Sequence, residues 1–193
     1  DVAKLFTNAE NTLLNTQSLW KNSCMYSTKE ISKTVARRLE LKESLFYAIE
    51  DKELLLHYQP IVDLESGNLT GVEALVRWHH PKFGMLLPEK FIPLAKETGL
   101  IVDLSKWVLK QACKQARMWH EAGFKSLSMT INISAIEFDQ AKLIGHIEGV
   151  LAETGMPPEL LELDIAESVL MQDAEMSVKI LQSLKEIGVR IAI

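Results

Sequence analysis

The chain of 193 residues is poor in cysteine, has no long apolar run and lacks an excess of positive charge. Its two cysteines, Cys24 and Cys113, lie in different contexts, so we expect reduced thiols and no disulfide. No apolar run approaches the ~20 residues that a membrane-spanning helix needs. No charged segment followed by an apolar one opens the chain, as a secretory signal would. A net charge of −5 argues against DNA or RNA bound by bulk electrostatics.

What is present is typical of one globular domain with a sizeable core, since 47% of the residues are hydrophobic and 24% are charged. Apolar periodicity and helix-ending glycines predict strands and helices that alternate along most of the chain. This alternation favours an α/β fold with parallel strands. The expected strands are 54–62, 69–78, 127–134, 160–167 and 189–193, and the expected helices are 28–50, 88–98, 103–122, 139–154 and 174–187.

The strand at 69–78 has one apolar and one polar face, because alternate residues of a strand point to opposite sides. Val72, Ala74, Val76 and Trp78 share one side, and the other side holds an acid, a leucine and a base: Glu73, Leu75 and Arg77. The same parity recurs in the later strands, where Thr130, Asn132, Ser134, Glu162, Asp164 and Arg190 fall on the polar side.

Two interpretations of the polar faces remain open. In the first, the polar side chains are solvated or satisfy one another. In the second, helices cover the apolar faces of a (β/α) barrel and the polar residues line its interior near the carboxyl ends of the strands. Glu73, Asn132 and Asp164 would then converge as hard oxygen ligands suited to Mg²⁺ or Mn²⁺. Arg77, one inward step beyond Glu73, suits an anion such as phosphate.

Several motifs resemble one known family when they are taken together. The segments are Y-Q-P-I-V-D at 58–63, G-V-E-A-L-V-R-W-x-H-P at 71–81, G-M-L-L-P-E-K-F-I-P-L-A at 84–95 and I-N-I-S at 131–134. They are similar to the EAL domain, which takes its name from the triplet at 73–75. The resemblance covers about residues 40 to 193. A weaker resemblance of residues 1–26 is to the end of a GGDEF domain.

The resemblance implies a domain organisation and a fold. Residues 1–26 would be the tail of a GGDEF-like domain, 27–50 a linker helix, and 51–193 the N-terminal part of an EAL domain. The fold implied is a TIM-like (β/α) barrel with an antiparallel first strand, of which the chain carries about five of eight strands. Because residue 1 is Asp and the family continues past Ile193, we expect a piece of a longer protein.

The activity implied is that of a bacterial signalling enzyme, a phosphodiesterase that opens cyclic di-GMP to linear pGpG with Mg²⁺ or Mn²⁺. Glu73, Asn132 and Asp164 would hold the metal, with Glu73 and Glu167 as catalytic residues. Gln59, Leu75 and Arg77 would contact the dinucleotide. The fragment itself is expected to be inactive, because the family's Asp pair and Lys lie beyond Ile193.

Two substitutions support an alternative function. The family's E-x-T-E stretch reads Asp-Ile-Ala-Glu at 164–167, so Asp164 is one methylene shorter than the expected ligand and Ala166 lacks a hydroxyl. Mg²⁺ needs oxygens at ~2.0–2.1 Å in near-octahedral geometry. The alternative is therefore a degenerate EAL domain that binds cyclic di-GMP or a protein without turnover.

The resemblance also implies partners and a location. A homodimer through EAL domains is expected, as are upstream GGDEF or sensor domains. The expected location is the cytoplasm, with a parent protein that segments upstream of residue 1 can tether to the inner membrane.

Overall fold

The computed structural model describes residues 9, 29–134, 138, 143–171 and 173–193. The chain divides into two compact units, Asp1–Tyr47 and Ala48–Ile193. The predicted GGDEF-like tail at 1–26 lies outside the described residues, apart from residue 9. No helix in the described ranges has both the length and the apolar character needed to cross a bilayer.

In the first unit, helix α2 spans Lys29–Leu45, so the predicted helix over 28–50 runs five residues too far at its C-terminal end. The amide of Phe46 donates to Glu43 O at 3.3 Å and that of Tyr47 to Ser44 O at 3.1 Å, which are the tighter bonds of a turn. The apolar spacing that reaches Ile49 therefore does not set the end of the helix.

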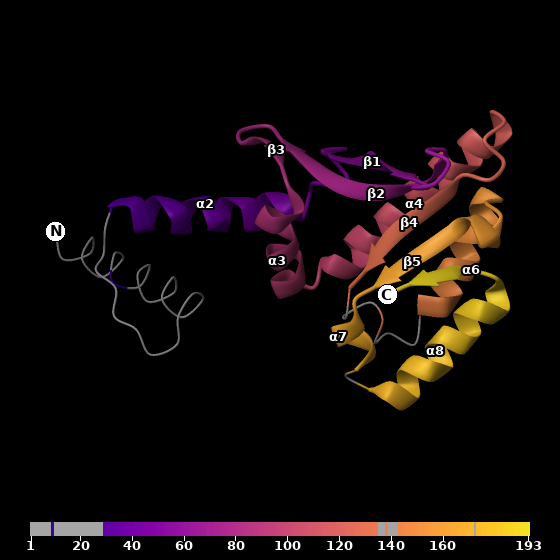
Figure 1. Ribbon diagram of the computed structural model, residues 1–193. Helices are drawn as coiled ribbons and strands as arrows, with labels where there is room; N and C mark the ends of the chain where they lie inside the picture. Colours follow the sequence, from indigo (N-terminus) through magenta and orange to yellow (C-terminus); the bar gives the residue numbers. More distant parts are fainter. Residues whose placement is uncertain (1–8, 10–28, 135–137, 139–142, 172) are drawn as a thin grey trace. The chain divides into compact units, whose positions relative to one another are not determined.

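The second unit contains a sheet whose strands follow the order β1-β2-β4-β5-β6, with β3 paired to the end of β2. These neighbouring strands are drawn as arrows in Figure 1. Strand β1 pairs antiparallel with β2, and the remaining pairs along the path are parallel. The bounds are β1 Leu54–Val62, β2 Leu69–His80, β3 Gly84–Leu86, β4 Ser128–Ile133, β5 Leu161–Ile165 and β6 Arg190–Ala192.

This topology confirms the predicted α/β class and the antiparallel first strand. The sheet is open over the described residues, since β1 and β6 form its two ends, and the path has the five strands that were predicted. The end position of β1 also explains how it holds Pro60, which cannot donate a ladder hydrogen bond.

Two of the helices that connect the strands end where the sequence predicts, each directly before a glycine. Helix α3 ends at Thr98 and helix α8 at Ile187, and each is followed by a glycine, Gly99 and Gly188, at φ 76° and 94°. This left-handed conformation is one that glycine adopts without strain. The helices are α3 Pro88–Thr98, α4 Ile101–Glu121, α6 Leu143–Thr154, α7 Glu167–Leu170 and α8 Ala174–Ile187, with a 3₁₀ turn η1 at Pro158–Leu160.

Three short elements, β3, η1 and α7, have no counterpart in the prediction, because three or four residues are too few to show a period. Strand β3 extends β2 beyond the predicted end at Trp78, since Trp78 pairs with Leu86 and His80 with Gly84. The two adjacent histidines differ as parity requires: His79 is exposed and His80 is buried.

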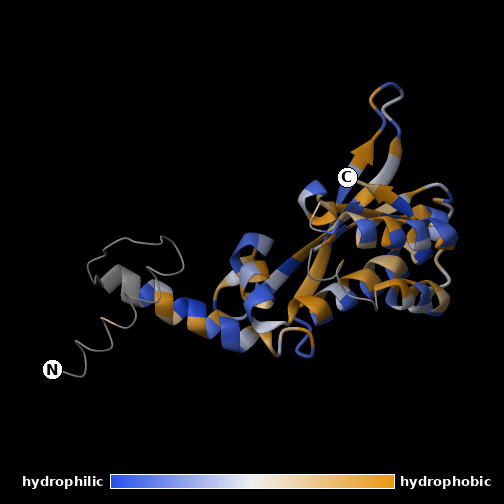
Figure 2. Cartoon of the chain, turned by 90° about the horizontal axis from the view of Figure 1, so that it is seen from below, coloured by the Kyte–Doolittle hydropathy of each residue, from blue (hydrophilic) through white to orange (hydrophobic). Residues whose placement is uncertain are grey.

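The core lies between one face of the sheet and the helices. Figure 2 shows hydrophobic residues concentrated on the strands, whereas the helices alternate hydrophobic and hydrophilic patches. Along β5, Leu161, Leu163 and Ile165 are fully buried, and Cys113 of α4 is buried in the same cluster. This face is the apolar one predicted from the strand parity.

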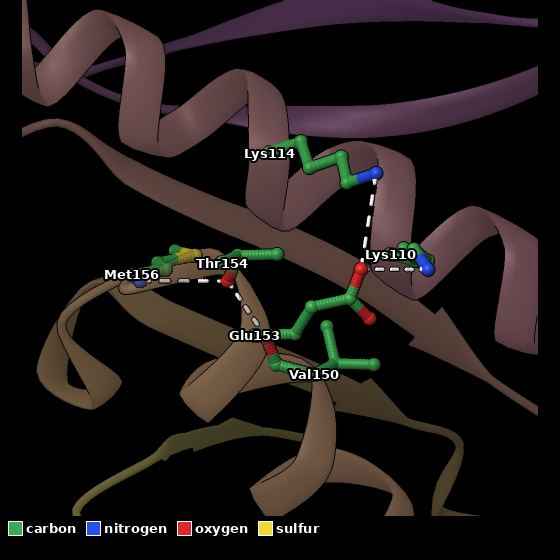
Figure 3. A network of polar contacts seen from close by, with 6 residues as sticks. All are labelled: Lys110, Lys114, Val150, Glu153, Thr154 and Met156. Carbon is green, nitrogen blue, oxygen red and sulfur yellow. Dashed lines mark hydrogen bonds and ion pairs between the residues drawn. The ribbon is translucent and has the colours of Figure 1, made fainter.

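Helix α4 also packs beside α6, and an ion pair joins their outer surfaces (Figure 3). Lys110 Nζ lies 2.7 Å from Glu153 Oε1, and Lys114 Nζ lies 4.0 Å from the same oxygen. All three side chains are about half exposed, so this contact belongs to the solvated surface and contributes little to stability.

Candidate functional site

The candidate site lies on the face of the sheet opposite to the core. Tyr58 of β1 fixes this orientation, because its ring packs edge-on against Trp119 of α4 with centroids 4.8 Å apart. Burial of the Tyr58 side chain raises its pKa above the usual value. The neighbours of Tyr58 along the strand, His57 and Gln59, therefore face the other way, and both are exposed.

The register of the strands arranges the polar face in rows. The first row contains Gln59, Glu73, Thr130, Glu162 and Arg190, each in register with the next. In the second row His57 pairs with Leu75, and Asn132 pairs with Asp164. Register partners point to the same side of a sheet, so residues from all five strands of the path share this surface.

Glu73 and Asn132 are in direct contact. Asn132 Nδ2 donates a hydrogen bond of 2.7 Å to Glu73 Oε1, from β4 to the neighbouring β2. The bond joins residues 59 positions apart in the sequence. The other carboxylate oxygen of Glu73, Oε2, and the amide oxygen of Asn132 take no part in this hydrogen bond. Both are hard oxygen atoms of the kind that divalent cations such as Mg²⁺ bind.

Asp164 lies beside Asn132 on β5 and is half-buried. Its carboxylate has no hydrogen bond or ion pair to the residues that the structure describes. The three predicted metal ligands therefore come from adjacent strands and share one face, as parity predicts, but contact between them is confined to Glu73 and Asn132. Their roles as ligands stay predictions.

The three predicted dinucleotide contacts also share this face. Gln59 is in register with Glu73, and Leu75 follows Glu73 by two residues on β2. Arg77 lies one step further, where its Nη1 donates to Val76 O at 2.8 Å. A guanidinium has five N–H donors, so most of its donors remain available to an anion.

Glu167 differs from the other predicted residues, because it is the first residue of α7 rather than part of β5. The strand predicted over 160–167 ends at Ile165, and the chain then enters this short helix through Ala166. The Glu167 side chain is exposed and makes no polar contact with Glu73, Asn132 or Asp164. A catalytic role for Glu167 stays a prediction.

A cavity of about 390 Å³ borders Glu73, Leu75 and Asn132. Its other lining is mostly on the helix-facing side of the sheet: residues of α3 and α4, with Ala74 and Val76 of β2 and Ile131 and Ile133 of β4. The cavity therefore lies largely between the sheet and the helices and meets the residues of the polar face only at one edge.

One polar network on this face was not assigned a role from the sequence. Thr130 Oγ1 donates to Glu162 Oε1 at 3.0 Å, and Arg190 Nε lies 3.8 Å from Glu162 Oε2. The parity of the strands had placed all three residues on the polar side. Their mutual contacts depend on the register of β4, β5 and β6, which the sequence does not specify. The exposed His57 was likewise not predicted as part of the polar face, although it precedes Tyr58 on the strand and therefore points to the opposite side.

The side-chain oxygens of the three predicted ligands are of the chemical type that divalent cations bind. Among the described residues, no group of three or more acidic, histidine or cysteine side chains is arranged to hold a metal ion. The candidate set instead combines two carboxylates and an amide oxygen, which are ligands for Mg²⁺ or Mn²⁺.

The strand order and the covering helices define an α/β, TIM-barrel-like domain whose sheet has one polar face. The chain belongs to the EAL domain family, whose sequence model matches residues 42–193. This result confirms the predicted resemblance.

Curated relatives agree with this assignment. Over 190 residues, or 98% of the chain, it is 36% identical to the bifunctional diguanylate cyclase/cyclic di-GMP phosphodiesterase MucR of Pseudomonas aeruginosa. It is 34% identical, again over 98% of the chain, to the cyclic di-GMP phosphodiesterase NbdA of the same organism. The chain spans only 28% and 24% of these relatives' lengths.

Solved structures extend the likeness to the fold. The structure described as "PaMucR Phosphodiesterase, c-di-GMP complex" has a TM-score of 0.78 and 42% identity, over 80% of this chain and 62% of that one. The Xanthomonas citri FimX EAL domain in complex with c-diGMP has a TM-score of 0.72 and 26% identity, over 83% and 62% of the two chains.

Proposed function

We propose that this chain is part of a phosphodiesterase that hydrolyses cyclic di-GMP to linear pGpG with Mg²⁺ or Mn²⁺. The observation that carries the proposal is the 2.7 Å contact between Asn132 and Glu73 on the polar face, with Asp164 in register beside Asn132. The names of the relatives MucR and NbdA supply the reaction.

In this proposal Glu73, Asn132 and Asp164 would hold the metal. A bound divalent ion would polarise the phosphate and lower the pKa of a water for in-line attack. The amide of Asn132 orients the Glu73 carboxylate by donating to one of its oxygens. The other carboxylate oxygen and the amide oxygen are then available as ligands.

The substrate would lie along the same face. Arg77 would turn donors toward a phosphate of the dinucleotide, because a guanidinium binds phosphate oxygens with paired hydrogen bonds. Gln59 and Leu75 flank Glu73, through the β1–β2 register and along β2 respectively. They would contact a base with an amide and an apolar surface. Glu167 would act from the start of α7.

The test is hydrolysis of cyclic di-GMP by the full-length natural protein, with products separated by chromatography. We expect linear pGpG to form with Mg²⁺ or Mn²⁺. Loss of a partner of a metal ligand already reduces metal affinity or activity by about 10–100-fold, so Glu73→Gln should reduce the rate at least about 100-fold.

The matched control is Glu65→Gln, which removes a carboxylate from the exposed loop between β1 and β2. This variant should keep the wild-type rate. If the wild-type protein forms no product with either metal, the proposed activity is wrong.

A second candidate is binding of cyclic di-GMP without hydrolysis. The observation in its favour is that Asp164, although in register with Asn132, makes no hydrogen bond or ion pair with Glu73 or Asn132 in the described part of the chain. Calorimetry that shows binding of cyclic di-GMP, together with no pGpG in the assay, would support this candidate against the enzyme.

The remaining expectations concern the longer protein. We propose a cytoplasmic EAL domain that forms a homodimer and is controlled by upstream GGDEF or sensor domains. Light scattering of the full-length protein with and without cyclic di-GMP tests the dimer.

A further inference from the structure

A third acidic residue, Glu162, lies among the predicted metal ligands on the polar face. It precedes Asp164 by two residues on β5, which is about 6.6 Å along a strand. It is in register with Thr130, which is itself in register with Glu73. By position alone, Glu162 could compete with Glu73 and Asp164 for a cation.

Both carboxylate oxygens of Glu162 are already engaged. Oε1 accepts a hydrogen bond of 3.0 Å from Thr130 Oγ1, and Oε2 lies 3.8 Å from Arg190 Nε. Thr130 is only 5% exposed. Glu162 keeps 25% of its side chain exposed, against 48% for Arg190. Glu162 therefore accepts a hydrogen bond from a buried threonine through one oxygen and is paired with the more exposed Arg190 through the other.

These contacts show which charged side chains on the polar face are paired with one another and which are not. Arg190 offsets Glu162, and Arg77 is bonded to Val76 O one step beyond Glu73. Two carboxylates, Glu73 and Asp164, then remain without a cationic side chain within 4 Å among the described residues. A carboxylate that kept its full charge near the site would strengthen the attraction for a cation, so pairing Glu162 with Arg190 removes that contribution.

We propose that Thr130 and Arg190 hold Glu162 in a charge-balanced pair beside the metal site, so that Glu162 neither binds the ion nor adds its charge to the attraction for it. This inference rests on the proposed metal site at Glu73, Asn132 and Asp164. It gives Arg190 the role of cancelling the charge of Glu162, because an unpaired charge of either sign in this row would change the field at the neighbouring row of ligands.

The test measures binding of Mn²⁺ to the full-length natural protein by electron paramagnetic resonance of the free ion, without substrate. A unit charge about 10 Å from a divalent ion changes affinity by roughly three- to tenfold when water partly screens it. Arg190→Gln removes a positive charge, so Mn²⁺ should bind roughly three- to tenfold more tightly by this estimate. Glu162→Gln removes a negative charge and should weaken binding by a similar factor.

The opposite signs distinguish an electrostatic role from damage to the structure, which would weaken binding in both variants. The double variant E162Q/R190Q should return within about twofold of the wild type, because the charges cancel. Arg190→Lys keeps the charge and should bind as the wild type does. If R190Q does not fold, E162Q and the double variant carry the test, because damage by Glu162→Gln would not be reversed when the charge of Arg190 is removed as well.

The control is the outer ion pair of α4 and α6 shown in Figure 3, with Lys110 Nζ 2.7 Å from Glu153 Oε1. Lys110→Gln and Glu153→Gln should each leave Mn²⁺ affinity within about twofold, because this pair is solvated and remote from the polar face.

Three outcomes would overturn the proposal. Equal weakening by R190Q and E162Q would show a structural role only, and no change in either would show that the pair does not influence the ion. In both cases wild-type binding of Mn²⁺ leaves the proposed function intact. A wild-type protein that binds no Mn²⁺ overturns the metal site, and this inference with it.

Discussion

The two faces of the sheet in residues 48–193 belong to the same strands but differ in burial and chemistry. In β5, Leu161, Leu163 and Ile165 are fully buried against the helices, whereas Glu162 and Asp164 between them stay partly exposed. The helix-facing side holds the fold together through burial of apolar area. The opposite side carries carboxylates, an amide and arginines, which supply the chemistry. Stability and function are therefore separable residue by residue within one strand.

The largest expected effect comes from a pair of neighbours on opposite faces. Leu163→Ala should lower the free energy of unfolding by about 2–5 kcal/mol, because it leaves a cavity in a fully buried position. Asp164→Ala should change it by less than about 1 kcal/mol, since the side chain is partly exposed and has no partner in the described part of the chain. Urea unfolding followed by circular dichroism measures both. Equal losses of unfolding free energy in the two variants would contradict the conclusion that the helix-facing side carries the stability.

Much of this division could be predicted from the sequence. Alternation placed Glu73, Asn132 and Asp164 on one side because a strand has a period of two, which local sequence shows directly. Glycines after α3 and α8 marked both helix ends, because the left-handed conformation there favours glycine.

The remaining features depend on contacts between distant segments. The choice of Asn132 as the partner of Glu73 follows from the offset between β2 and β4 and from side-chain reach. The Thr130–Glu162–Arg190 contacts follow from the register of three strands. Strand β3 exists because it pairs with the end of β2, and its three residues carry no pattern of their own.

The next prediction concerns a closely packed place on the polar face, at Gly71 of β2. A Cβ added at Gly71 would lie 2.1 Å from Ser128 Oγ and 3.2 Å from Ser128 O. Gly71→Ala must therefore displace the serine hydroxyl, which donates to Thr70 O at 3.2 Å. We expect a loss of about 1–3 kcal/mol in the free energy of unfolding, as for other overpacked positions.

Gly145 on α6 is the matched control, because a Cβ there meets nothing within 4 Å. Gly145→Ala should stabilise the protein by up to about 1 kcal/mol, since alanine favours the helix. Adding Ser128→Ala to Gly71→Ala should recover part of the loss. If Gly71→Ala is as stable as the wild type, the start of the polar face is not tightly packed.

A smaller effect is expected from lengthening the acid on the polar face. Asp164→Glu extends the carboxylate toward its neighbours by one methylene. If Asp164 reaches a cation only through a water, the longer side chain should tighten Mn²⁺ binding by a few-fold, which is below about 1.4 kcal/mol. Electron paramagnetic resonance of free Mn²⁺ measures this, and Glu159→Asp on η1 is an exposed control. Weaker binding by Asp164→Glu would show that the native length is already the better fit.

The last prediction tests the buried face through the one thiol in the described part of the chain. Cys113 is fully buried on α4, and this burial raises its pKa to about 12. Since an exposed thiol has a pKa near 8.5, the unfolded chain loses this proton at lower pH than the folded chain does. The stability that the neutral thiol contributes is complete below about pH 8.5 and falls as pH rises toward the folded pKa.

Between pH 7.5 and 9.5, this single proton should lower the free energy of unfolding by about 1.4 kcal/mol. Cys113→Ala lacks the proton, so its pH dependence should be shallower by that amount, whatever its baseline stability. Both proteins should carry Cys24→Ser, so that Cys113 is the one thiol that titrates. The common slope from lysine and tyrosine residues cancels in the comparison. Equal slopes would mean that the thiol titrates alike in the folded and unfolded states. Water would then have to reach Cys113, and the helix-facing side of the sheet would be less tightly packed than the burial of Cys113 indicates.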